Sequence, residues 1–327
     1  MTAAPFHVIF MGTPDFAVPA LNALHGFGCR VDLVVTQPDR PRGRGRKLAP
    51  PPVKQAAEKL GYPIVQPSAV NTDAFYDTLS SLQPDLMVVV AFGHILPKRI
   101  LEIPRLAPIN LHASLLPRYR GPAPIQWAII EGAAETGVTA MLMDKGLDTG
   151  EMLASKSTPI DPDDTAGSLH DRLAEMAAGV LVETLHGFSD GTIRPVPQNH
   201  AEATYAPMLS KTDGHVDWHQ PAEKIERIIR GMSPWPGAYT FMGQMRLKLF
   251  AARVAAKTED QPPGTVIRGF DNELRVSAGQ NAVSITQIQG ASGKRLDIAD
   301  FLKGTSVPVG TVLSSPNRMP VKTRFRS

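Results

Sequence analysis

Short apolar runs alternate with amphipathic stretches over the first 190 residues of the chain. The nearly unbroken apolar run DLMVVVAFG (85–93) is typical of a parallel strand that is buried on both faces. Strands are predicted at 7–12, 30–37, 63–67, 85–93, 108–114, 138–144 and 150–160, and helices after residue 12 and at 53–60, 71–82, 123–132 and 165–188. This order predicts an α/β domain, doubly wound, mostly parallel and Rossmann-like.

A different pattern begins after the last long helix. Residues 191–207 are rich in Pro and polar residues and lack helical periodicity, so they are predicted to be a linker. Short alternating segments with Gly turns follow, which predict a smaller C-terminal OB-like β-barrel. The expected organisation is therefore a catalytic domain over 1–190, a linker over 191–207 and a second domain over 208–327.

Polar side chains alternate at the end of one predicted strand. In INLHAS, Asn110, His112 and Ser114 share one face and the apolar residues share the other. Ligands of open α/β sheets bind at the carboxyl ends of the strands. An amide and an imidazole at this position are suited to stabilising a negative charge that develops on a carbonyl oxygen.

A carboxylate that fits this site lies in DKGLDTGEM (144–152). Asp148 lies between two glycines, which allow a tight turn, and an acid beside His112 would orient the imidazole. Taken alone, His112 is more simply a structural histidine and Asp148 a turn residue. Together, Asn110, His112, Ser114 and Asp148 indicate only a small-molecule transferase or hydrolase. Ser114 lacks the G-x-S-x-G context of a nucleophile.

Other chemistry is weakly supported. The chain has no G-x-G-x-x-G after its first strand and no Walker A sequence, so nicotinamide and ATP enzymes are not indicated. HVDWH could place His215, Asp217 and His219 on one face, but a solvent-facing strand explains the same spacing. We expect no metal.

Composition narrows the class of protein further. The chain has 327 residues, a net charge of +3 and a single cysteine, Cys29. One cysteine permits no disulfide within the chain, which favours a reducing, cytoplasmic location. No apolar run approaches the roughly 20 residues that span a bilayer, and no secretory signal is recognised, so no membrane association is expected.

One loop concentrates positive charge. Residues 40–54 carry six cations and no acid, with glycines and prolines that oppose a helix. A solvated loop is the simple interpretation, but phosphates in a row would relieve the repulsion between these cations. The residues predicted to bind nucleic acid are Arg40, Arg42, Arg44, Arg46 and Lys47.

Six segments together resemble one family over most of the chain. They are MGTPDFAVPAL, TQPDRPRGRGRKL, VVVAFGHILP, NLHASLLPRYRGPAPIQWAI, ETGVTAMLMDKGLDTGEML and GMSPWPGAY. In this order they resemble the methionyl-tRNA formyltransferase family. S-L-L-P and R-G-x-x-P are shared with the wider group of 10-formyltetrahydrofolate-dependent formyltransferases, whereas the GRGRK loop is more particular to the tRNA enzymes.

The resemblance implies a reaction and a set of residues. A formyl group would pass from 10-formyltetrahydrofolate to the α-amino group of methionine on initiator tRNA, and the protein would act as a monomer. Asn110, His112 and Asp148 match the family's catalytic residues, and Arg44 matches an arginine that reaches the tRNA acceptor end. The family's folate-contacting segment falls on Ser114, Leu115, Leu116 and Pro117.

Three other functions stay open at this point. A sugar-nucleotide amine formyltransferase would share the N-terminal site but would not need the arginine–glycine loop. A 10-formyltetrahydrofolate hydrolase would release formate without an acceptor. A non-catalytic RNA-binding protein could have kept the fold, although the three intact catalytic positions argue against it.

Overall fold

The chain divides into two units. The computed structural model describes residues 6–42, 47–290 and 293–316. The first unit contains most of residues 6–207, and the second contains residues 208–316 together with the short segments 126–133 and 161–167. The segment predicted as a linker, 191–207, belongs to the first unit.

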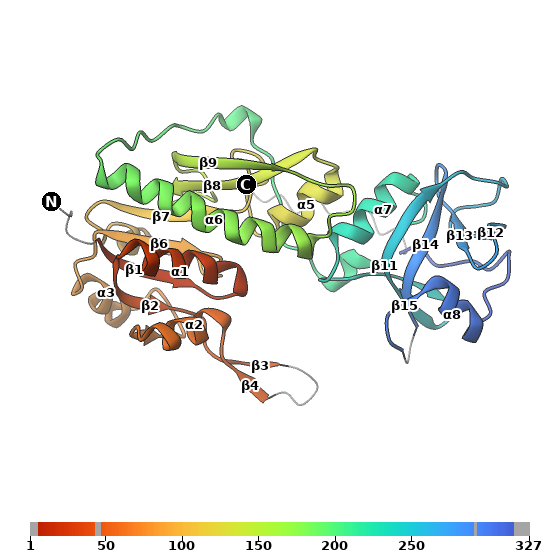
Figure 1. The fold of residues 1–327 in the computed structure, drawn as a ribbon, viewed down its shortest axis with the longest axis horizontal. Coiled ribbons are helices and arrows are strands. Elements are labelled where there is room, and N and C mark those ends of the chain that lie inside the picture. The colour runs from red at the N-terminus through yellow and green to blue at the C-terminus, as the bar shows by residue number, and fades with distance from the viewer. Residues whose placement is uncertain (1–5, 43–46, 291–292, 317–327) are drawn as a thin grey trace. The chain divides into compact units, whose positions relative to one another are not determined.

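The first unit is built on a seven-stranded sheet with the order β5-β2-β1-β6-β7-β8-β9 (Figure 1). The parallel strands are β1 (His7–Gly12), β2 (Arg30–Val35), β5 (Ile64–Val65), β6 (Leu86–Val90) and β7 (Ala107–His112). The antiparallel edge consists of β8 (Glu135–Leu142) and β9 (Met152–Pro159). The doubly wound, mostly parallel domain is confirmed.

Helices connect these strands. They are α1 (Val18–Phe27), α2 (Pro52–Leu60), α3 (Asp73–Ser80), α4 (Lys98–Leu101), α5 (Pro124–Glu131) and α6 (Ala166–Ser189). The helix predicted over 71–82 begins later because Thr72 is its N-cap and accepts a hydrogen bond from the Phe75 N–H. The short helix α4 was not predicted, since one turn carries no periodic signal.

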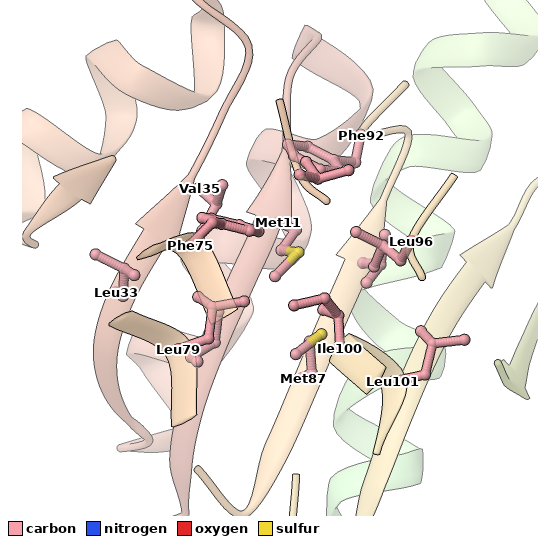
Figure 2. Packing of buried hydrophobic residues seen from close by; sticks show 13 residues of the cluster. Met11, Leu33, Val35, Phe75, Leu79, Met87, Phe92, Leu96, Ile100 and Leu101 are labelled. Carbon is pink, nitrogen blue, oxygen red and sulfur yellow. The ribbon is translucent and has the colours of Figure 1, made fainter. Parts of the chain in front are cut away.

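One face of the sheet is closed by α3 and α4. Side chains from β1, β2 and β6, such as Ile9, Leu33 and Met87, meet Phe75 and Leu79 of α3 in a buried cluster (Figure 2). Figure 1 shows α1 and α6 in front of the sheet. Because the strands are covered along their length, ligands reach this sheet at the strand ends.

The second unit is an antiparallel sheet. Its strands are β10 (Ala238–Met242), β11 (Met245–Ala255), β12 (Val266–Ile267), β13 (Leu274–Ser277), β14 (Ala282–Gln289) and β15 (Leu296–Asp297). The helix α7 (Ala222–Gly231) precedes these strands in the chain, and α8 (Ile298–Gly304) follows them. The order β10-β11-β14-β13-β12, with β15 beside β14, is a curled sheet that agrees with the predicted OB-like domain. Trp218 is fully buried in this unit and donates to the Thr240 hydroxyl at 3.1 Å.

The basic loop has structure at its base. The strands β3 (Arg40–Arg42) and β4 (Lys47–Ala49) pair as an antiparallel hairpin, which the Pro-rich sequence did not predict. No helix in the described part of the chain is long and apolar enough to cross a membrane.

We predict that Leu79→Ala destabilises the protein strongly. Leu79 is fully buried in the cluster under the sheet, so truncation removes apolar contacts and leaves a cavity. Urea denaturation followed by circular dichroism should show a loss of about 2–5 kcal/mol in the free energy of unfolding. The control Leu106→Ala, at a side chain that is 52% exposed, should cost less than about 1 kcal/mol. Equal effects of the two substitutions would contradict this account of the core.

Candidate active site

The candidate site begins at the carboxyl end of β7, which lies between β6 and β8 in the sheet. This strand pairs in parallel with β6, where Val89 is opposite Asn110, and antiparallel with β8, where Thr139 is opposite His112. Asn110 and His112 are two residues apart on the strand and therefore share a face. Among the described residues the Asn110 side-chain amide has no hydrogen-bond partner, so it is available to a ligand.

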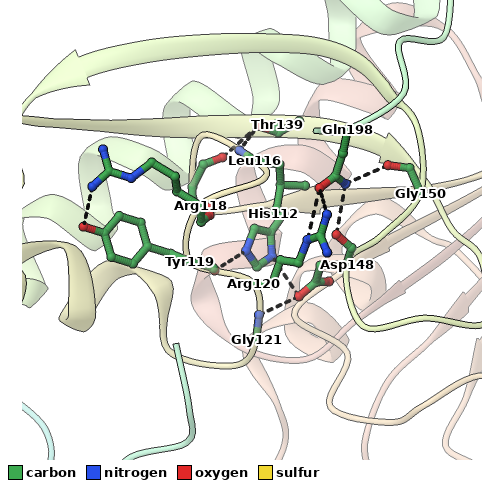
Figure 3. A network of polar contacts seen from close by, with 11 residues as sticks. His112, Leu116, Arg118, Tyr119, Arg120, Gly121, Thr139, Asp148, Gly150 and Gln198 are labelled. Carbon is green, nitrogen blue, oxygen red and sulfur yellow. Dashed lines mark hydrogen bonds and ion pairs between the residues drawn. The ribbon is translucent and has the colours of Figure 1, made fainter. Parts of the chain in front are cut away.

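The chain between β8 and β9 must fold back to reach His112. Leu142, the last residue of β8, is opposite Ile109, and the Met143 N–H donates to the carbonyl of Pro108 at 2.9 Å. These contacts are toward the start of β7, away from its carboxyl end. Asp148 nevertheless lies beside His112, with its Oδ2 3.7 Å from Nδ1. The return of this loop brings the two predicted residues together (Figure 3).

Backbone geometry in this loop explains the glycines around the acid. Asp148 itself has a φ of +53°, a left-handed conformation that Asp tolerates better than most residues. A side chain at Gly150 would place its Cβ 1.8 Å from the carbonyl oxygen of Leu142, so only glycine fits there. The Asp144 carboxylate accepts from the Gly146 N–H at 2.8 Å and the Thr149 hydroxyl at 2.6 Å, which closes the turn.

A tripeptide after β7 holds both members of the His–Asp pair. The ring Nε2 of His112 lies 2.9 Å from the carbonyl oxygen of Tyr119, which can only accept, so Nε2 carries a proton and donates. The backbone N–H of Gly121 donates to Oδ2 of Asp148 at 2.7 Å. Nδ1 of His112 therefore faces the carboxylate of Asp148. The His112 side chain is 7% exposed and the Asp148 side chain 14%.

The segment Ser114–Pro117 forms the turn that leads into this tripeptide. The strand ends at His112, so Ser114 does not continue the polar face as the alternation suggested. Its hydroxyl is buried and donates to the carbonyl of Arg118 at 2.6 Å. The Thr139 hydroxyl donates to the Ser114 carbonyl at 2.7 Å and accepts from the Leu116 N–H at 3.2 Å, and Leu116 is buried as well. These contacts fix the shape of the turn.

An open pocket of about 370 Å³ lies along the same sheet edge. Its walls come directly after β1, β2 and β6 and from the base of the basic hairpin. They are formed by Thr13, Pro14, Gln37, Pro38, Arg40, Pro41, Ala49, Pro50, Pro51, Pro52, Ala91, Phe92 and Gly93. Gln37 connects the segment after β6 to the basic hairpin, because its amide nitrogen donates to the carbonyl of Phe92 at 3.3 Å and its amide oxygen accepts from Arg40 at 2.9 Å.

The predicted cations differ in what the structure describes of them. The Arg40 side chain is exposed and lines the pocket, whereas for Arg42 and Lys47 the hairpin backbone is described. Arg44 and Arg46 lie outside the described residues. Lys54, the last cation of the run, pairs with Asp39 at 2.9 Å, and hydrogen bonds from Gln66 and Lys54 hold the pKa of Asp39 below its usual value.

The weaker metal hypothesis finds no support in the described part of the chain. His215 stacks on Tyr239 and its Nε2 lies 3.2 Å from the Ser314 carbonyl, while His219 pairs with Asp217 at 2.9 Å. Burial lowers the pKa of His215. No group of three or more His, Cys, Asp or Glu residues converges as metal ligands within the described ranges.

Comparison with known proteins identifies the family to which the chain belongs. The formyl transferase family model matches residues 6–185, and the model for the formyl transferase C-terminal domain matches residues 208–306. A methionyl-tRNA formyltransferase from Desulfotalea psychrophila is 50% identical over 94% of this chain and 95% of its own length. The chain belongs to the methionyl-tRNA formyltransferase family. A second member, from Pelobacter propionicus, is 51% identical over the same shares of the two chains.

Solved structures of formyl transferases and related proteins share the fold at low identity. WlaRD, described as a sugar 3N-formyl transferase in the presence of dTDP and 5-N-formyl-THF, has a TM-score of 0.65 and 17% identity, covering 89% of this chain and 100% of its own. HypX from Aquifex aeolicus in complex with tetrahydrofolic acid has a TM-score of 0.62 and 19% identity, covering 94% of this chain and 51% of its own. At these identities the likeness concerns the fold.

Sequence reasoning missed the groups that hold the His112–Asp148 pair. These are the carbonyl of Tyr119 and the N–H of Gly121. The R-G-x-x-P pattern that includes Gly121 was a signal, but no role followed from it. Backbone groups carry no residue-type signature, so their function appears only when the turn is folded.

We predict that the neutral His112 ring carries its proton on Nε2. The Tyr119 carbonyl accepts from this nitrogen, and the carboxylate of Asp148 offers Nδ1 no donor. Long-range ¹H–¹⁵N correlation spectra of histidine-labelled protein, assigned with a His112→Gln variant, should show a protonated Nε2. A neutral ring protonated on Nδ1 alone would contradict the hydrogen bond to Tyr119.

Proposed function

We propose that this protein transfers the formyl group of 10-formyltetrahydrofolate to the α-amino group of methionine on initiator tRNA. One observation carries the proposal. A buried His112–Asp148 pair lies beside an available Asn110 amide at a sheet edge, in a chain about half identical, over 94% of its length, to methionyl-tRNA formyltransferases. The product is formylmethionyl-tRNA, used in translation initiation.

Asn110 and His112 stabilise the charge that develops on the formyl oxygen. The neutral amine attacks the formyl carbon, and the carbonyl electrons move onto oxygen in a tetrahedral intermediate. The Asn110 amide donates to this oxyanion without titrating. Since Nε2 of His112 is committed to Tyr119, the ring donates through Nδ1, which requires the doubly protonated form. The carboxylate of Asp148, 3.7 Å from Nδ1, stabilises that positive charge by Coulomb attraction.

Asp148 also assists the proton transfer that completes the reaction. The attacking nitrogen becomes positively charged when the new C–N bond forms, and it must lose one proton before the intermediate collapses. The Asp148 carboxylate is the base that we assign to this step, and it accepts the proton directly or through water. The bond from the formyl carbon to N10 of the folate then breaks, and N10 takes the proton that Asp148 had accepted, directly or through water.

The folate binds beside the turn that follows β7. Ser114, Leu115, Leu116 and Pro117 are the family's folate-contacting positions in this chain. In this turn the Ser114 hydroxyl and the Leu116 side chain are buried, so these two residues act by fixing the surface on which the pterin lies. Leu115 and Pro117 are partly exposed and are available for direct contact.

The aminoacylated end of the tRNA enters through the pocket at the same edge. Its walls include Phe92 and a run of prolines, which suit an apolar methionine side chain, and Arg40 at the mouth suits a phosphate. Arg42, Arg44, Arg46 and Lys47 continue this charge along the basic loop. Cations on a loop beside the pocket would fix the register of the acceptor stem through its phosphates. The curled sheet of the second unit would provide a further tRNA surface.

The protein acts as a cytoplasmic monomer. Burial raises the pKa of the single thiol, Cys29, to about 11, so at neutral pH it stays protonated and unreactive. A chain with one inert thiol makes no disulfide, which agrees with a reducing compartment.

The direct test is formyl transfer with purified protein, 10-formyltetrahydrofolate and either methionyl-initiator tRNA or methionyl-elongator tRNA. Formylmethionine formed mainly on the initiator is the expected result. A sugar-nucleotide amine formyltransferase would instead formylate an amino sugar and neither tRNA. A hydrolase would release formate at the same rate with and without tRNA. Either result would overturn the proposed acceptor.

We predict that Asp148→Asn abolishes most of the turnover and spares tRNA binding. Asn tolerates the left-handed backbone at this position and can occupy the same space, but it neither stabilises the imidazolium nor accepts the proton. The kcat should fall by about a hundredfold or more, while the Kd for tRNA changes by less than about twofold. Near-normal turnover in the folded variant would remove Asp148 from the mechanism.

We predict that Arg44→Ala raises the KM for methionyl-tRNA more than the KM for 10-formyltetrahydrofolate. The loop is proposed to contact phosphates of the acceptor stem, so loss of a cation weakens tRNA binding and reduces its salt dependence. The matched control is Arg105→Ala, an exposed arginine just before the start of β7, at the end of the strand away from the proposed site. Steady-state kinetics that show equal effects on both substrates would contradict the assigned role of the loop.

A further inference from the structure

A glutamine from the segment after α6 holds the loop that carries Asp148. The side-chain amide of Gln198 donates to two backbone carbonyls, that of Asp148 at 3.0 Å and that of Gly150 at 2.7 Å. These carbonyls flank the point where the chain turns back toward His112. One amide therefore closes the loop on the side opposite to the Gly121 N–H, which holds the carboxylate (Figure 3).

A buried arginine holds this glutamine in turn. The Oε1 of Gln198 accepts from Nε of Arg120 at 3.1 Å and from a terminal nitrogen of the same guanidinium at 2.6 Å. These two bonds identify which end of the amide is oxygen, so the end that faces the loop carbonyls is the NH₂ group. A cation on the oxygen polarises the amide and strengthens both donations from its nitrogen.

Arg120 is an unusual residue to bury for stability alone. It is 2% exposed, and no carboxylate of the described residues forms an ion pair with it. Its other side-chain partner is the His200 ring, 3.1 Å away. Taking a guanidinium out of water without a counter-charge is costly. A local cost of this kind is typical of sites where positioning matters to function.

The arginine also lies between the two groups that hold the catalytic pair. It is the middle residue of the tripeptide whose Tyr119 carbonyl holds His112 and whose Gly121 N–H holds Asp148. The same segment that supplies Gln198 fixes this tripeptide through its backbone. The Arg120 N–H donates to the carbonyl of Thr204 at 2.8 Å, and the Ala206 N–H donates to the carbonyl of Arg120 at 2.7 Å.

We propose that Gln198, held by Arg120, is a positioning residue for Asp148. It fixes the turn at a conformation that brings the carboxylate to His112, and this role rests on the proposed function of the pair. Segment 196–206 is therefore part of the catalytic machinery, although its sequence is that of a linker. Without the two donations from Gln198, the Gly121 N–H still holds the carboxylate, but the backbone of the loop is no longer fixed and the carboxylate is held less precisely against Nδ1.

The test uses Gln198→Glu in the full-length protein. Glutamate keeps the shape and still accepts from Arg120, now as an ion pair, but its ionised carboxylate donates nothing to the carbonyls of Asp148 and Gly150. The control is Gln83→Glu, an exposed glutamine three residues before the start of β6, at the amino end of that strand and away from the site.

For Gln198→Glu the kcat of formyl transfer should fall about tenfold or more, as in the loss of a well-positioned acid–base group. The KM for each substrate and the Tm should stay close to those of the control variant. In the Asp148→Asn variant, adding Gln198→Glu should cause little further loss of kcat, because Gln198 acts through the Asp148 carboxylate. An unchanged kcat, or a full additional loss in that background, would overturn the proposal.

Two further measurements distinguish a positioning role of Gln198 from a folding defect and from failure of the proposed reaction. If Gln198→Glu does not fold, the double variant Arg120→Met/Gln198→Met removes both partners together and leaves no orphaned charge; it should fold and show the same loss of kcat. If the unaltered protein forms no formylmethionine, the proposed function fails. The His112 ring ¹⁵N signals then decide the positioning role, which fails if Gln198→Glu leaves them unchanged.

Discussion

The site depends on the return of one loop over the end of β7. The register of β7 and β8 takes the chain away from His112, and only a loop that folds back brings Asp148 to within 3.7 Å of the ring. The contacts that hold this loop at the site involve backbone atoms: the Gly121 N–H donates to the carboxylate, and the Gln198 amide donates to the carbonyls of Asp148 and Gly150. Because such bonds are directional and buried, they define one position for the carboxylate.

The sheet gives this loop a rigid support. Buried side chains of β1, β2 and β6 pack against α3 and α4, and ligands of such open sheets bind at the strand ends. The open pocket and the end of β7 both lie along this edge. A donor and an acceptor that must react can therefore approach the same few residues from one side, which reduces the entropic cost of bringing them together.

Charge is distributed unevenly in the first unit, in a way that fits its proposed substrates. Lys54 is neutralised by Asp39, and Arg120 is buried against neutral partners. Arg40 is different, because it is exposed at the mouth of the pocket and bonds only the neutral Gln37 among the described residues. Arg40 is therefore an exposed cation at the proposed entry of the tRNA, where a phosphate would supply a counter-charge.

The sequence by itself determined the class of fold and the two architectures, and it supplied the side chains that we propose to react. Unbroken apolar runs, helical periodicity and short alternating segments are local patterns, and the polar residues of INLHAS and DKGLDTGEM stand out from them. The family follows from the same motifs. Segment 191–207 shows the limit of such patterns, since its Pro-rich sequence predicted a linker and its contacts join it to the first unit.

Only the tertiary structure decided how the reacting groups are held. The carbonyl of Tyr119, the N–H of Gly121 and the two carbonyls bound by Gln198 are backbone atoms, which every residue has and no motif distinguishes. Gln198 is 50 residues from Asp148 along the chain, and nothing in its neighbourhood indicates a partner. Contacts at such separations form when the sheet brings distant segments to one edge, so residue types establish the chemistry and the fold establishes the geometry.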